Sequence, residues 1–320
     1  MNDNPNITER KQIKYKETDM RSAVYFKRYL KWCFALAWIM QIYAGLQYLQ
    51  GNGLSYTFML AISMFAPMVA VGAAGGRLRG MGWKLHVERY FLSFLQAWFL
   101  PAILGVIGAA LYFLIFPDRL DLSCGYIAAA LGDEMVAEFA SMGISQQEYA
   151  LMSLMEALTL APFINMLFAV GEEAGWRGVM YPVLKDRFGV MKGRIIGGTI
   201  WGIWHWPIMI LAGYEYGSTY FGAPVLGPLL FCLICIALGT FADELYERTD
   251  CIWIPALFHG AVNAFAGVPI LYLNTAYADQ LILGPLMIGL IAGLPLLIGA
   301  GLILYRSRNT ALMLYRENEN

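Results

Sequence analysis

Hydrophobic residues in this chain form long continuous runs that are separated by shorter polar segments. Each run has about 20 residues, the length a helix needs to cross roughly 30 Å of hydrocarbon. The runs cover residues 29–49, 55–74, 91–116, 150–171, 194–213, 224–242, 253–273 and 281–304. In the fifth run Gly198 and Gly202 are four residues apart, which predicts a close approach of two helix backbones. The pattern predicts an all-α, polytopic membrane protein with about eight transmembrane helices.

Basic residues between the runs predict how the chain lies in the membrane. Lysine and arginine gather before the first run, in alternate loops and after the last run, whereas the loop at 117–149 is acidic. Because basic loops tend to stay in the cytoplasm, we expect both termini there, as an even number of spans requires. The expected parts are a cytoplasmic tail at 1–28, a membrane domain at 29–305 and a cytoplasmic tail at 306–320. We assign no function to the loop at 117–149.

Composition excludes several classes of function. Hydrophobic residues make up 59% of the chain and charged residues 14%, against roughly 25% charged residues in soluble domains. A net charge of −1 gives no field that would attract nucleic acid, so we expect no nucleic-acid partner. The five cysteines form no disulfide framework, and no motif indicates a nucleotide, flavin or haem site. The lipid bilayer is the first partner that the sequence predicts.

Two adjacent carboxylates stand at the end of the fourth run. Glu172 and Glu173 belong to the segment Gly-Glu-Glu-Ala-Gly-Trp-Arg at 171–177. Carboxylates at the edge of a bilayer are costly unless they are paired, and they usually have a function. Glu173 and Arg177 are four residues apart, so they share a helix face and can pair, whereas Glu172 is turned by about 100°. We therefore expect Glu173 to point towards Arg177 and away from the histidines described next.

Two of the three histidines lie inside other apolar runs. His205 follows Trp201 by one helical turn, and His259 precedes Asn263 by one turn. All the motifs enter the membrane from the predicted cytoplasmic side, so we expect a cavity that opens to the cytoplasm. A single intramembrane histidine can instead serve only as a hydrogen-bonding group between helices. The combination favours a site, whose expected lining residues are Glu172, His205, His259 and Asn263.

Glutamate, histidine and asparagine together are suited to hydrolysis by activated water. In one version Glu172 takes a proton from water with the help of His205. His259 and Asn263 then donate hydrogen bonds to the oxyanion that develops on the scissile carbonyl. In a second version a divalent metal such as zinc is held by Glu172, His205 and His259. The sequence contains neither HExxH nor Gly-x-Ser-x-Gly, and it leaves the metal-dependent and metal-free versions open.

The three motifs resemble those of the CPBP family of intramembrane proteases, which is named for CAAX prenyl proteases and bacteriocin-processing proteins. That family carries Glu-Glu-x-x-x-Arg, then an aromatic-x-x-x-His, then His-x-x-x-Asn on successive membrane helices. The resemblance covers about residues 160–270, with tryptophan where the second motif usually begins with phenylalanine. It implies an eight-helix endopeptidase with Glu172 as the principal catalytic residue. The implied catalytic set is Glu172, Glu173, His205, His259 and Asn263, supported by Arg177 and Trp201.

The substrate and one alternative function stay open. Members of the family act on prenylated CAAX-type tails, and others process secreted peptides or give immunity to them. The resemblance therefore implies a peptide or a lipidated protein as substrate. The alternative is a non-enzymatic immunity or transporter-like protein that uses the same polar residues for binding, although the chain shows no inverted repeat. In either case we expect an integral, multi-pass membrane protein of unknown oligomeric state.

Overall fold

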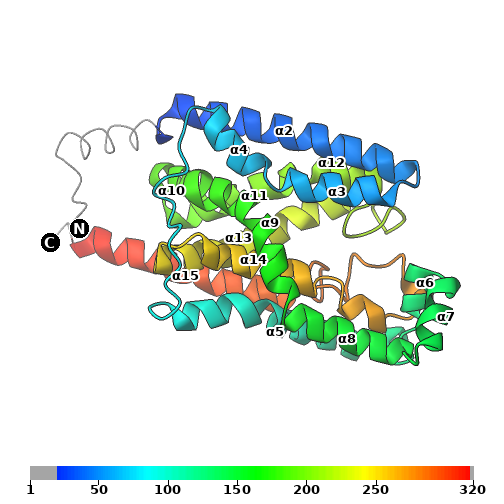
Figure 1. Ribbon diagram of the computed structural model, residues 1–320. Helices are drawn as coiled ribbons and strands as arrows, with labels where there is room; N and C mark the ends of the chain where they lie inside the picture. Colours follow the sequence, from blue (N-terminus) through cyan, green and yellow to red (C-terminus); the bar gives the residue numbers. More distant parts are fainter. Residues whose placement is uncertain (1–19, 318–320) are drawn as a thin grey trace.

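The long helices of the protein run side by side and form a bundle (Figure 1). The computed structural model describes residues 20–317, so parts of the expected tails, residues 1–19 and 318–320, lie outside the described residues. Within 20–317 the regular secondary structure is helical, with one isolated bridge between Leu120 and Leu273 and no strand. The all-α prediction is confirmed for this part of the chain.

Helices occur along the whole described part. The α-helices are α2 (Ala23–Leu49), α3 (Gly53–Ser63), α4 (Ala66–Ala73), α5 (Phe91–Ile115), α6 (Tyr126–Leu131), α7 (Asp133–Ser141), α8 (Gln146–Leu158), α9 (Ala161–Gly175), α10 (Tyr181–Phe188), α11 (Val190–Trp204), α12 (Trp206–Ala212), α13 (Leu226–Thr249), α14 (Trp253–Phe265) and α15 (Leu294–Glu317). Short 3-10 segments are η1 (Pro117–Arg119), η3 (Pro269–Tyr272) and η4 (Thr275–Tyr277), and η2 (Trp176–Met180) is a π-helix.

Fewer helices than expected have the length and hydropathy of a membrane span. Among the described residues four segments qualify: Phe91–Ile115, Val190–Ala212, Leu226–Thr249 and Trp253–Tyr272. Two bent pairs raise the number to six, α3 with α4 at 46° and α8 with Ala161–Phe188 at 52°. A multi-pass membrane protein is thus supported, whereas the predicted eight spans are not confirmed.

The first and last expected runs account for the difference. The whole first run, residues 29–49, lies in helix α2. Gln41 and Gln47 lower the hydropathy of this helix, and α2 is not among the four qualifying segments. In the last run only α15 is helical. Residues 281–293 fold back on themselves, with the Leu290 N–H donating to the Ile282 carbonyl at 2.9 Å. Gly284 has a φ of +143°, which glycine adopts readily, and it interrupts any helix there.

Glycines bring the motif-bearing helices into close contact. A Cβ atom on Gly202 of α11 would lie 2.5 Å from the Cα of Cys232 in α13, and one on Gly198 would lie 2.3 Å from the Cα of Ile236. The close backbone approach predicted from these two glycines is confirmed. On α14 a Cβ atom at Gly260 would lie 2.5 Å from the backbone nitrogen of Met166 in α9. These contacts hold α9, α11, α13 and α14 together around one interior.

Replacing Gly202 with leucine is expected to push α11 away from α13 and lower the stability of the protein by about 1–3 kcal/mol, because an overpacked contact forces the backbones to shift. Thermal unfolding of the purified protein in lipid or detergent measures the change. The matched control is Gly301→Leu on α15, where a Cβ atom meets nothing within 4 Å. Equal unfolding temperatures of the two variants would contradict the close packing.

A buried ion-pair network joins the N-terminal part of α11 to the C-terminal part of α13. The Nε of Arg194 lies 2.7 Å from Oδ2 of Asp243, and both side chains are fully buried. Lys185 of α10 pairs with the same carboxylate at 2.8 Å. A carboxylate at this depth is tolerated because two cations share its charge. The network holds these ends of α10, α11 and α13 together. It is separate from the polar residues around Glu172, which are described next.

Candidate active site

Glu172 lies in the last turn of α9, where two indole rings hold its carboxylate. Oε2 accepts hydrogen bonds from Nε1 of Trp176 at 3.1 Å and from Nε1 of Trp201 at 2.7 Å. Trp176 opens the π-helix that continues α9 into α10, a geometry often found at functional sites. Trp201 comes from α11, so the second bond depends on the packing of two separate helices. The carboxylate therefore has a fixed orientation.

Glu173 connects α9 with α14. Its Oε2 lies 2.8 Å from Nη1 of Arg177, as the four-residue spacing predicts. Its Oε1 lies 2.9 Å from Nδ1 of His259, so the prediction that Glu173 points away from the histidines is wrong. The spacing along α9 predicts a partner on the same helix but contains no information on the neighbouring helix. The close contact at Gly260 brings His259 alongside.

His205 stands at a break between α11 and α12. Its Nδ1 lies 3.0 Å from the backbone oxygen of Trp201. Since a carbonyl oxygen only accepts hydrogen bonds, Nδ1 carries the proton, and Nε2 of the neutral ring is free to accept one. The ring packs edge-on against Trp204 at 4.6 Å and Phe231 at 5.0 Å between centroids. These aromatic contacts fix the plane of the imidazole.

His259 and Asn263 complete the set from α14. The Nδ1 of His259 faces Glu173, and its ring packs edge-on against Trp201 with 5.2 Å between centroids. Asn263 follows one turn later, with an exposed side chain. A guanidinium–aromatic contact supports the arrangement, because Arg177 lies 5.3 Å from the centroid of the Trp201 ring. Arg177 and Trp201 therefore both contact residues of the expected catalytic set.

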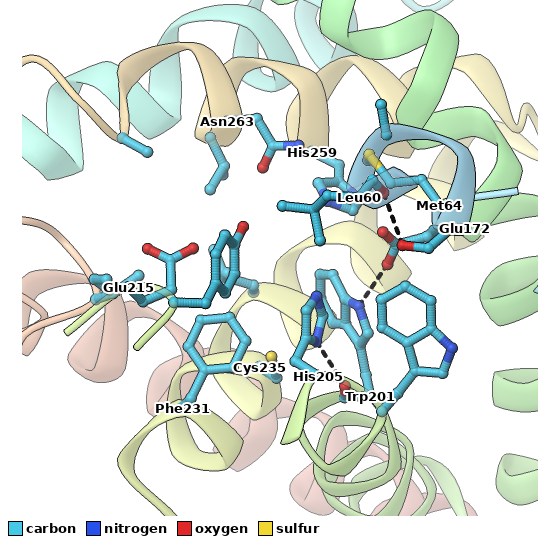
Figure 2. A pocket seen from close by; sticks show the side chains of 18 of the residues that line it. Leu60, Met64, Glu172, Trp201, His205, Glu215, Phe231, Cys235, His259 and Asn263 are labelled. Atoms are coloured by element: carbon cyan, nitrogen blue, oxygen red, sulfur yellow. Dashed lines mark hydrogen bonds between the residues drawn. The ribbon is translucent and has the colours of Figure 1, made fainter. Parts of the chain in front are cut away.

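The predicted residues line one cavity of about 230 Å³ (Figure 2). Its polar wall contains Glu172, His205, His259 and Asn263, as expected from the sequence. Glu173 is fully buried behind this wall and is not among the lining residues. Much of the remaining wall is apolar and comes from α3, α13 and α14, for example Leu60, Phe231 and Val262. The side of the membrane to which the cavity opens stays a prediction.

Two further lining residues, Tyr214 and Glu215, did not emerge from the sequence analysis. They lie in the loop after α12 and reach the same cavity. Burial raises the pKa of Glu215 to about 7, although a hydrogen bond from the Tyr214 hydroxyl opposes the rise. One feature of the sequence could have indicated Glu215: it is a carboxylate two residues after the apolar run 194–213, which contains His205.

The metal-bound version requires Glu172, His205 and His259 to converge on one ion. Among the side chains described for residues 20–308, no group of three histidines, cysteines, aspartates or glutamates is arranged to hold a metal. This arrangement does not fit the proposed ligand set, so we derive no step through a metal.

The helices and the cavity define a multi-pass membrane protein with a buried polar site. Residues 154–265 match a family model described as Rce1-like, type II CAAX prenyl endopeptidase Rce1-like. The chain is also 28% identical over 102 residues to a protein named CAAX prenyl protease 2 from Methanococcus maripaludis. That match covers 32% of this chain and 37% of the relative. The resemblance to the CPBP family is confirmed on the segment that carries all three motifs.

Proposed function

We propose that the protein is an intramembrane endopeptidase that hydrolyses a peptide bond with a water molecule activated by Glu172 and His205. The observation that carries the proposal is the convergence of Glu172, His205, His259 and Asn263 on one cavity. These residues come from α9, the α11–α12 break and α14, and they lie within the segment that matches the peptidase family. A purely structural histidine would not need a shared cavity with a carboxylate.

Water activation begins at Glu172. The carboxylate accepts a proton from water as the water oxygen attacks the scissile carbonyl carbon. Trp176 and Trp201 hold the carboxylate through Oε2, so it does not need to reorganise when the reaction starts. His205 accepts a hydrogen bond at Nε2 and orients the water. The proton held by Glu172 then passes to the leaving amine, which completes the cleavage of the C–N bond.

The developing oxyanion is stabilised from α14. Asn263 donates from its amide nitrogen, and His259 donates from Nε2. Because Nδ1–H of His259 already faces Glu173, donation from Nε2 requires the ring to carry both protons. The buried Glu173 carboxylate supplies the counter-charge for such a ring. In this account Glu173 is a positioning residue that acts through His259.

The test is cleavage of a peptide panel by the purified protein in lipid. The panel contains a prenylated C-terminal peptide and several unlipidated leader-like or membrane peptides, and each is assayed with wild type and with Glu172→Ala. Cleavage that disappears in the variant supports the proposal. A strong chelator in parallel reactions tests the metal-assisted version, because only that version loses activity. Equal cleavage by both proteins would overturn the assignment, and a cellular phenotype that survives Glu172→Ala would favour a non-enzymatic immunity or binding function.

Trp201→Phe is expected to lower kcat/KM by about tenfold, because it keeps the aromatic wall but removes the N–H donor to Glu172. Hydrogen bonds to charged groups contribute roughly 1.5–3 kcal/mol, and about 1.4 kcal/mol corresponds to a factor of ten. Steady-state kinetics on the best peptide of the panel measure the effect. Trp83→Phe is the matched control, since the Trp83 indole donates to the Leu78 carbonyl outside the cavity. Equal losses in both variants would remove the special role of Trp201.

A further inference from the structure

One carboxylate in the wall of the cavity has no part in the hydrolysis. Glu215 lies across the cavity from Glu172 (Figure 2). We propose, building on the proposed peptidase function, that Glu215 selects the substrate: it favours a peptide with a lysine or arginine side chain near the scissile bond and disfavours a free C-terminal carboxylate in the cavity. Glu215 thus acts as a specificity residue for the same reaction.

The loop after α12 holds Glu215 in a defined place. Gly213 ends α12 in the left-handed region, and Glu215 itself has a φ of +75°. This conformation is unfavourable for a glutamate by about 1–2 kcal/mol, so the surrounding structure must maintain it. The next residue anchors the loop, because the buried Tyr216 hydroxyl donates to the Ile288 carbonyl at 2.8 Å. Strained positions of this kind concentrate at functional sites.

Glu215 lies only one side chain away from the catalytic histidine. The ring of Tyr214 stacks parallel to the His205 ring, with 6.3 Å between centroids. Tyr214 is also the direct neighbour of Glu215 in the loop, and its hydroxyl opposes the rise in the pKa of the Glu215 carboxyl. An extended peptide advances about 3.3 Å per residue, so a substrate whose scissile carbonyl lies at His205 passes Glu215 within a few residues. Glu215 is therefore close enough to contact substrate side chains next to the cleaved bond.

No lysine or arginine among the described side chains lines the cavity around Glu215. Glu215 forms no ion pair with the side chains described for residues 20–308, and the His259 ring of the same wall is already paired with the buried Glu173 carboxylate. Its pKa of about 7 leaves a large ionised fraction at neutral pH. An unpaired, partly desolvated carboxylate is stabilised by an incoming cation and destabilised by a second anion. A free C-terminal carboxylate would also find no guanidinium or ammonium group there to hold it.

Binding to a cleavage-deficient protein tests the charge preference separately from the reaction. The probes are fluorescent, C-terminally amidated hydrophobic peptides in which one lysine is moved along the chain, and matched peptides with norleucine. A third set keeps the free C-terminal carboxylate. With the Glu172→Gln protein in lipid, the best lysine position is expected to bind about tenfold tighter than norleucine. The free-carboxylate peptides are expected to bind more weakly than their amides.

Variants at Glu215 test whether this residue is the source of the preference. In the Glu172→Gln background, Glu215→Gln is expected to bring the lysine-to-norleucine affinity ratio close to one, and Glu215→Lys to reverse the preference between amide and free acid. The matched control is Glu138→Gln, an exposed carboxylate on α7 that does not line the cavity. It is expected to keep the wild-type ratio. Folding of each variant is checked by its thermal unfolding temperature.

The affinity ratio should also depend on pH. Below about pH 6 most of Glu215 is protonated and the lysine preference falls, whereas above about pH 8 it is fully present. The ionisable groups that face Glu215 are Tyr214 and Tyr216 of its own loop, Tyr56 of α3 and Cys235 of α13. The same pH series on the Glu172→Gln, Glu215→Gln protein shows which part of the change belongs to Glu215, because His205 and His259 are present in both proteins.

The two proposals fail in different ways. A lysine-to-norleucine ratio near one, or one that Glu215→Gln leaves unchanged, overturns the role of Glu215 even when the wild-type protein cleaves peptides. A lysine preference that depends on Glu215 supports the role of Glu215 as a specificity residue. If the wild-type protein at the same time cleaves no peptide of the panel, the result argues against the peptidase function. Preferential binding of the free-carboxylate peptides by the Glu215-containing protein would contradict the inference directly.

Discussion

Glu172→Gln is expected to lower kcat/KM by about 10²- to 10⁴-fold, the range that general-base catalysis contributes, while the protein keeps its unfolding temperature. Glutamine has the same shape as glutamate, and its amide oxygen can still accept the hydrogen bonds from Trp176 and Trp201. It cannot take a proton from water. Steady-state cleavage of the best peptide and thermal unfolding, measured on the same preparation, test both parts of this expectation.

Glu138→Gln provides the control for Glu172→Gln, because it makes the same chemical change on the exposed surface of α7. It is expected to leave kcat/KM unchanged. A binding assay with an uncleaved peptide shows whether Glu172→Gln affects binding or the chemical step, and we expect kcat to account for most of the loss. A kcat/KM of Glu172→Gln within threefold of the wild-type value would show that Glu172 is not the general base.

Glu173→Ala is expected to destabilise the protein by about 3–5 kcal/mol and to abolish most of its activity. The change leaves the guanidinium of Arg177 buried without its ion-pair partner, and the remaining contacts include the Gly239 carbonyl at 3.1 Å. It also leaves Nδ1 of His259 without the carboxylate that fixes the ring. Thermal unfolding and cleavage kinetics in lipid measure the two consequences.

Two further variants separate the structural role of Glu173 from its effect on His259. The double variant Glu173→Ala, Arg177→Met removes both charges, so we expect it to recover a large part of the stability. It should not recover activity, because His259 still lacks its partner. Glu173→Gln keeps an oxygen for Nδ1–H and is expected to retain more kcat than the double variant. Recovery of activity together with stability in the double variant would show that Glu173 is only structural.

Periodicity along each helix was sufficient to predict the local pairing within the site. The four-residue spacing of Glu173 and Arg177 predicts their ion pair, and the spacing of His259 and Asn263 places both on one side of α14. Local spacing could not reveal that Glu173 also contacts His259, since the two residues are 86 positions apart. The same limit applies to the bond between Trp201 and Glu172, which joins two helices.

Hydropathy located the apolar runs but overestimated how many form continuous spans. Residues 281–304 have the apolar length of a span, yet Gly284 and the backbone bonds around Ile282 turn the first part into a folded loop. Such a segment is stable when its polar backbone groups form hydrogen bonds within the protein. Average hydropathy cannot distinguish it from a spanning helix, because both are equally apolar. The role of Glu215 was missed for a similar reason, because the fold of its loop places it in the cavity.

The sequence by itself determined that this is an all-helical membrane protein and predicted four polar residues of its cavity, Glu172, His205, His259 and Asn263. Both conclusions follow from properties of short segments: apolar length, helical spacing and the cost of burying charge in lipid. Only the tertiary structure decided which side chains face one another, because those contacts depend on how closely neighbouring helices approach. Gly198, Gly202 and Gly260 permit that approach, and it converts separate motifs on α9, α11 and α14 into one cavity.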